Sequence, residues 1–155
     1  MNNYSELLLY IKQLADADPY ISTVTNKGFV NTDEYISNLY PLFDIVVTGA
    51  SYPSQQMKQF EVTLSCLAPR DVNPELTNDK FFGNDNEIDN LNECEACLNR
   101  IWLIMNRDFP KNNIVATADP DLDIILEEKE NVLDGWSMSI SVITPNTTLS
   151  LCSQT

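Results

Sequence analysis

The chain has 155 residues, 43% of them hydrophobic and 21% charged, which is the size and composition of one folded domain with a single core. It carries 23 acidic and 9 basic residues, a formal net charge of −14, and such a surface disfavours binding to nucleic acid through phosphate contacts. The absence of histidine removes the commonest general base and zinc ligand, and no apolar run is long enough to span a membrane.

The first predicted element is an amphipathic helix over residues 4–17. Asn3 and Glu6 have the spacing of a capping box, apolar residues then recur at helical intervals, and Asp18-Pro19 ends the pattern. The first residues lack the basic segment and cleavage site of a signal peptide, so we expect a chain that is made and kept in a cytoplasm.

Strands are predicted next. A short strand is expected near Ile21–Thr25, within a polar and mixed segment. Residues 42–48 form a β-branched run, and from Phe60 to Cys66 apolar and polar residues alternate as in a strand with one buried face. We expect the two longer strands to form an antiparallel pair joined by a long exposed loop over residues 49–58.

A long irregular segment and the longest helix follow. Residues 68–86 contain two prolines, a glycine and several asparagines, which predicts an extended loop or arm. A second capping-box pattern, Asn84–Glu87, opens the helix, whose apolar stripe includes Cys94 and which ends at Asp108–Pro110.

Two strands close the pattern. The first is an acidic segment around Ile124–Leu126. The second is the segment Leu133–Ile143, in which two sets of residues alternate: Trp136, Met138, Ile140 and Val142 on one face, and Ser137, Ser139 and Ser141 on the other. We expect the apolar set to pack on the long helix and the serines to lie on the far side of the sheet. Residues 146–155 form a polar C-terminal tail.

This order of elements predicts the fold class. Residues 1–155 are expected to form a single α+β domain, an antiparallel β-sheet with two amphipathic helices packed on one face and long extended loops.

The cysteines are the strongest candidates for chemistry. Cys94 and Cys97 form a C-x-x-C motif that, with Cys66 and Cys152, could supply four thiolate ligands to zinc. The motif lies within a helix rather than at its N-terminus, and Cys94 belongs to the apolar stripe. We therefore interpret these residues as core cysteines rather than as a metal or redox site.

Carboxylates give no stronger indication of an active site. Asp119, Asp121, Asp123 and Glu130 share part of the spacing of a calcium-binding EF-hand loop, but Ile124 stands where the turn needs glycine. The acidic residues near the last turn, Glu127, Glu128, Glu130 and Asp134, are expected to be exposed, without the burial that tunes an acid–base pair. We therefore predict no catalytic, cofactor-binding or metal-binding residue, and no enzymatic activity.

Aromatic residues in predicted loops favour contact with another protein. Tyr52, Phe81, Phe82 and Phe109 lie in or beside segments without a pattern of their own, and Phe81-Phe82 leads directly into a helix cap. We expect these four residues to form an oligomer interface.

Five segments of the chain together resemble a known protein family. They are Asp18–Gly28, Leu39–Ala50, Phe60–Val72, Phe81–Met105 and Leu133–Asn146. Their sequence and order are similar to short neck and tail ring proteins of crAss-like and related tailed phages of Bacteroidetes. The element order also resembles the head–tail connector and tail-terminator fold.

The resemblance implies a structural virion protein, a homo-oligomeric ring in the neck or tail. The ring would be assembled in the host bacterial cytoplasm, with twelve-fold symmetry favoured over six-fold. It would connect portal-side components to the tail, contact adjacent neck, tail or portal proteins, and let double-stranded DNA pass through its lumen without specific binding. An alternative of another class is a soluble monomeric acidic module, an anti-host protein or DNA mimic, with a basic partner.

Overall fold

The structure is a computed structural model that describes residues 4–26, 40–71, 75, 77–83, 85–112, 114–117, 119–128 and 132–146. Two α-helices, one 3-10 helix (η3) and six strands occur in these residues. In chain order they are α1 (Tyr4–Asp16), β1 (Thr23–Asn26), β2 (Leu42–Ser54), β3 (Met57–Pro69), α2 (Glu87–Asp108), η3 (Phe109–Asn112), β4 (Val115–Ala116), β5 (Asp121–Glu128) and β6 (Val132–Pro145).

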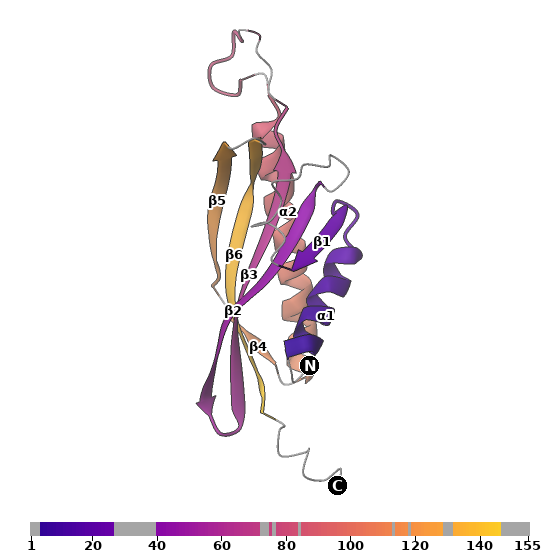
Figure 1. Cartoon of the computed structure of the whole chain (residues 1–155), viewed down its shortest axis with the longest axis vertical. Helices are drawn as coiled ribbons and strands as arrows, with labels where there is room; N and C mark the ends of the chain where they lie inside the picture. The colour runs from indigo at the N-terminus through magenta and orange to yellow at the C-terminus, as the bar shows by residue number, and fades with distance from the viewer. Residues whose placement is uncertain are drawn as a thin grey trace.

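Both helices cover the same face of a single sheet (Figure 1), which confirms the predicted α+β class. The apolar stripe of α1 buries Leu7 and Ile11, and that of α2 buries Leu98 and Ile101, all within one hydrophobic cluster with β2, β3 and β6. The cluster forms because each helix presents its apolar stripe to the apolar face of the alternating strands.

The sheet is mixed, and its order is β1-β2-β3-β6-β4, with β5 also paired to β6. The pair β2–β3 is antiparallel, as predicted. The pair β3–β6 is also antiparallel, but the sequence did not predict that these two strands are neighbours. The short β1 differs, since it runs parallel to β2. The outer edge of β6 is shared by β5, along Val132–Ser139, and by β4, along Val142–Ile143. The two-residue β4 is too short to leave a periodic signal in the sequence.

The expected long loop over residues 49–58 is wrong. Strand β2 continues to Ser54 and β3 begins at Met57, so a turn at residues 55–56 joins them directly. The resulting hairpin extends at one end of the sheet (Figure 1). The sequence did not predict this hairpin because Gly49 and Pro53 usually interrupt a strand. In the structure both residues lie within β2, where the register with β3 shifts between Val47 and Ser54.

The alternation in β6 places its residues as predicted. Met138, Ile140 and Val142 are buried against the helices, and Trp136 packs at the edge of the same cluster. The indole Nε1–H of Trp136 donates a hydrogen bond to the carbonyl oxygen of Leu91 in α2, at 3.0 Å. The serines of the strand therefore lie on the face of the sheet that carries no helix.

The start of α2 differs from the predicted capping box. Its N-cap is Asn86, whose side chain does not cap the helix. The Asn86 amide instead accepts a hydrogen bond from the backbone N–H of Asp71, at 2.6 Å, and so ties the end of the preceding segment to the helix. Asn3, Asn84 and the tail beyond Asn146 lie outside the described residues, as do parts of the predicted arm.

A buried hydroxyl on β6 supplies the first testable prediction. Thr144 is 1% exposed, and its Oγ1 has no hydrogen-bond partner among the described residues. Because an unsatisfied buried hydroxyl costs free energy, Thr144→Val is expected to raise the free energy of unfolding by about 1 kcal/mol. Thr25→Val is the control and is expected to lower the free energy of unfolding, because the Thr25 hydroxyl donates a hydrogen bond to Asp44 at 2.7 Å. Urea denaturation measures both, and a loss of stability in Thr144→Val would contradict the prediction.

Candidate functional site

The segment before α2 presents two phenylalanines in an ordered turn. The carboxylate Oδ1 of Asp79 accepts hydrogen bonds from the backbone N–H groups of Phe81 and Phe82, at 3.0 and 3.2 Å. The Asp79 carbonyl accepts from the N–H of Gly83, at 3.0 Å. Gly83 has φ +72°, a conformation that favours glycine. We call residues Asp79–Gly83 the phenylalanine turn.

The rings of this turn are held in place but uncovered. Phe81 is 84% exposed and Phe82 59% exposed, and their centroids lie 4.9 Å apart in an edge-to-face arrangement. The segment that carries them projects beyond the end of the sheet (Figure 1). Two adjacent exposed aromatic rings on a preorganised turn are typical of an anchor for another protein.

Tyr52 and Phe109, the other two predicted interface residues, have different surroundings. Tyr52 is 70% exposed on the hairpin of β2 and β3, so it is available for contact. The expected exposure of Phe109 is wrong, because this side chain is 1% exposed. Its backbone continues from α2 into η3, which turns the ring into the core, where it packs 5.5 Å from the ring of Tyr10. Phe109 therefore stabilises the fold.

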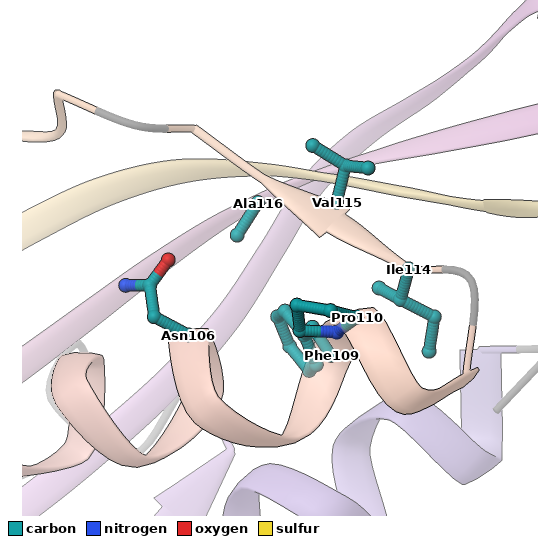
Figure 2. Close-up of a pocket in the computed structure, with 6 residues that line it drawn as sticks. All are labelled: Asn106, Phe109, Pro110, Ile114, Val115 and Ala116. Atoms are coloured by element: carbon teal, nitrogen blue, oxygen red, sulfur yellow. The ribbon is translucent and has the colours of Figure 1, made fainter.

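A pocket of about 440 Å³ opens beside Phe109, at the C-terminal end of α2. Figure 2 shows its residues, contributed by α2, η3, β4 and the residue before β4: Asn106, Phe109, Pro110, Ile114, Val115 and Ala116. Val115 is 61% exposed because its side chain points away from η3, toward the face of the sheet without helices (Figure 2). We call this site the α2–β4 pocket. It lacks the cluster of titratable side chains that catalysis requires, and its lining suits an apolar occupant.

Two basic residues lie near Asp108, at the C-terminal end of α2. Arg107 and Lys111 are both exposed and lie one turn apart around Asp108. The Nε–H of Arg107 donates to Oδ1 of Asp108 at 3.0 Å, and this hydrogen bond lowers the pKa of the Asp108 carboxyl.

A second shallow pocket, of about 390 Å³, lies between α1 and the strands β1 and β2. Leu8, Leu9 and Val24 contribute to its lining, and Leu9 is 55% exposed. It carries one charged residue, Lys12, which forms an exposed ion pair with Asp16. No nucleophile with an adjacent base is present in it.

The face of the sheet without helices has a polar part and an apolar end. The apolar end is a second buried cluster of Tyr40, Leu42, Leu67 and Leu133 with Ile125 packed against it, and the rest is mainly polar. The strand register brings Thr63 and Ser65 of β3 opposite Ser139 and Ser137 of β6, beside Asp121 and Asp123 of β5. The Ser141 hydroxyl donates to Glu61 at 2.6 Å. In the described strands, the residues whose register places them on this face include no lysine or arginine. We call it the open face.

The cysteines lie in the core, as interpreted from the sequence. Cys66, Cys94 and Cys97 are each 0% exposed. Interaction with the thiols of Cys94 and Cys97, together with burial, raises the pKa of the Cys66 thiol, whereas hydrogen bonding with Cys66 lowers the pKa of the Cys94 thiol. Within the described residues, no three histidine, cysteine, aspartate or glutamate residues are grouped so as to hold a metal ion. Asp121 and Asp123 belong to an extended strand, and Cys152 lies outside the described residues.

One buried ion pair was missed. Asp134, expected to be exposed, is 0% exposed on the helix side of β6. The Arg70 guanidinium donates to both of its carboxylate oxygens, and the Asn90 amide donates at 3.3 Å. The signal was present in the sequence, because Asp134 shares the alternation of Trp136 and Met138 and so occupies an apolar position. The network joins β3, β6 and α2, which is a structural role.

The sequence was also compared with known proteins. No model of a known protein family and no curated protein matches it. Neither of the described α-helices has the combination of length and apolar composition that crossing a bilayer requires.

Proposed function

We propose that this chain is a structural subunit of the neck or tail of a tailed phage, and that copies of it form a ring around the channel through which DNA passes. The observation that carries the proposal is the open face, which outside its apolar end is rich in small hydroxyls and carboxylates and has no lysine or arginine in its described strands. In the ring this face points toward the lumen.

Such a face suits the passage of DNA. Serine and threonine hydroxyls are satisfied by water or by neighbouring side chains, as Ser141 is by Glu61. Carboxylates repel phosphates, so a duplex moving through the ring meets no protein cation that could replace its condensed counterions and no site that holds it. The opposite face carries both helices and would form the outer wall.

Exposed aromatic residues support association between copies. Phe81, Phe82 and Tyr52 expose most of their surface at two different parts of the molecule. A contact that joins two different surfaces of identical chains is heterologous. Copies joined by such contacts close into a ring when a whole number of the rotations between neighbours makes one full turn.

The proposal predicts the effect of a charge placed in the lumen. Ser139 is exposed on the open face, so Ser139→Lys would add one cation per subunit to the channel wall. Assembled rings of this variant are expected to bind double-stranded DNA at low salt and to release it as salt is raised, whereas unmodified rings do not bind. Electron microscopy confirms assembly, and a gel-shift assay measures binding.

Asn99→Lys is the matched control. It adds the same charge on the exposed side of α2, away from the open face. Equal DNA binding by both variants would contradict the orientation proposed for the open face. A chain that stays strictly monomeric at high concentration, or that is absent from purified phage particles by mass spectrometry, would contradict the ring itself and favour the monomeric acidic module.

A further inference from the structure

Strand β5 leaves one edge of the sheet open. It pairs with β6 along one side, and no other described strand pairs with it. In Figure 1 it is the outermost strand, on the side of the sheet away from α1. Within the described part of the chain, the backbone N–H and C=O groups on its outer side therefore remain unpaired by any strand. Such an edge can accept a further strand.

Two apolar side chains beside this edge are uncovered. The register with β6 places Leu122, Ile124 and Leu126 on the face of the sheet that carries the helices. Leu122 packs against the core cluster, but α2 lies over β3 and β6, so Ile124 and Leu126 remain 50% and 47% exposed. An added strand would cover both of them, because side chains directly opposite one another on neighbouring strands lie about 5 Å apart.

The charges at the same edge limit which strand can be added. Asp121 and Asp123 are both exposed on the open face of β5. Two copies of β5 paired with each other would place their carboxylates near one another, and like charges on neighbouring strands are destabilising. The edge therefore excludes a second acidic strand and suits a strand that is apolar on one side and free of acidic residues on the other.

The C-terminal segment, residues 147–155, has this pattern. Leu149 and Leu151 are two positions apart, which is the spacing of the two exposed apolar residues of β5. The segment contains no charged side chain. Polar or small residues alternate with the leucines: Thr148, Ser150 and Cys152. Such a sequence presents both leucines on one face when it is extended as a strand.

One register matches the apolar residues of both strands. Antiparallel pairing that sets Leu151 opposite Ile124 brings the second leucine, Leu149, opposite Leu126. The same register places Cys152 on the open face, opposite Asp123. The leucines would then cover the exposed side chains of β5 without placing a carboxylate beside its two aspartates.

The C-terminal segment cannot reach this position on its own chain. Ile124 lies opposite Trp136, and β6 continues for nine residues beyond Trp136 before it ends at Pro145. That length of strand is about 30 Å. The six residues from Pro145 to Leu151 span at most about 22 Å when fully extended. Only the C-terminal segment of another copy can therefore pair with β5 in this register.

We infer that the C-terminal segment of one copy adds as a strand to the outer edge of β5 in the next copy, with its two leucines covering Ile124 and Leu126. The inference rests on the proposed function in one respect, since both require copies of the chain to associate, and it names the contact that joins them. The contact is heterologous, because each copy gives one segment and receives another, so it is of the kind that can close a ring. It extends the sheet sideways and leaves the open face uncovered.

Disulfide cross-linking tests this contact directly. Asp123→Cys places a thiol on β5 opposite the expected position of Cys152, at a separation that a disulfide can bridge. The remaining cysteines of the chain are buried. Mild oxidation of this variant is expected to give a ladder of covalent oligomers in denaturing gels. The unmodified chain and the variant Asp123→Cys/Cys152→Ser are expected to give none, because each has only one of the two thiols.

Ser139→Cys is the matched control. Ser139 is exposed on the same open face, but β5 lies between it and the added strand. It is expected not to cross-link with Cys152. Cross-linking of Ser139→Cys as strong as that of Asp123→Cys would overturn the inference. A disulfide that forms within one chain, between Cys152 and the thiol introduced by Asp123→Cys, would also overturn it.

Assembly gives a second readout. Leu149→Ser/Leu151→Ser is expected to raise the concentration needed for assembly at least tenfold, because it leaves the exposed apolar side chains of β5 uncovered. Thr147→Ser/Thr148→Ser changes the same number of residues in the same segment and is expected to leave that concentration within twofold. Analytical ultracentrifugation measures both variants.

The two readouts separate this inference from the proposed function. Rings that form without any cross-link between Cys152 and the thiol introduced by Asp123→Cys, and that tolerate the loss of both leucines, would overturn the added strand and leave the proposed function standing. A chain that never assembles would overturn both.

Discussion

Replacing Gly135 with alanine is expected to destabilise the protein by about 3 kcal/mol or more, the largest effect of any single methyl group that the structure indicates. A Cβ atom at this position would lie 1.9 Å from the carbonyl oxygen of Cys66 and 3.1 Å from the Cα of Leu67. Both neighbours are backbone atoms of β3, so no side chain can move aside. The substitution would separate β3 from β6 at the centre of the sheet.

Urea denaturation followed by circular dichroism measures this loss. Gly49→Ala is the matched control, because Gly49 also lies in a strand and a Cβ there would meet no atom within 4 Å. Its free energy of unfolding is expected to change by less than about 0.5 kcal/mol. Equal stability of the two variants would show that β6 does not approach β3 as closely as described.

Replacing Arg70 with methionine is expected to cost about 3–5 kcal/mol, because it leaves the buried carboxylate of Asp134 without its cation. The Asn90 amide, 3.3 Å away, offers one remaining hydrogen bond and no compensating charge. The variant Arg70→Met/Asp134→Leu removes both charges and is expected to be more stable than Arg70→Met alone.

Thermal and urea denaturation of the three proteins test this coupling. Lys12→Met is the comparison, since it breaks the exposed ion pair with Asp16 and is expected to leave the denaturation midpoint nearly unchanged. If Arg70→Met were no more damaging than Lys12→Met, the pair would not be buried in the folded protein. If the double variant were the least stable of the three, the Arg70–Asp134 network would stabilise the fold by more than the free energy needed to remove its two charges from water.

The parts of the fold that could be predicted from the sequence are those with regular periods. The stripe of α2 and the alternation of β3 and β6 recur often enough to fix the type of each element and the face that it buries. The missed features have no such repeat. β4 has two residues, the turn at 55–56 follows a stretch that contains Gly49 and Pro53, and the parallel pairing of β1 depends on contacts distant in sequence.

The candidate interface shows the same limit. Phe81, Phe82 and Tyr52 were predicted to be accessible because they lie in segments without a pattern of their own, and all three are exposed. The same reasoning was wrong for Phe109, because the 3-10 helix that follows α2 turns its side chain into the core. The α2–β4 pocket could not be predicted at all, because its lining comes together only when η3 and β4 pack side by side.

The pairing of β3 with β6 has a consequence for biosynthesis. All of the partners in this pair lie on opposite sides of α2 in the chain, and the nearest in sequence are Pro69 and Leu133. Contacts between such distant residues form slowly, because a long loop must close before they contribute. During synthesis, β2 and β3 also leave the ribosome well before β6, the strand that pairs with β3, has been made. During that interval the nascent hairpin has an unpaired edge, and it is the species most at risk of misassembly.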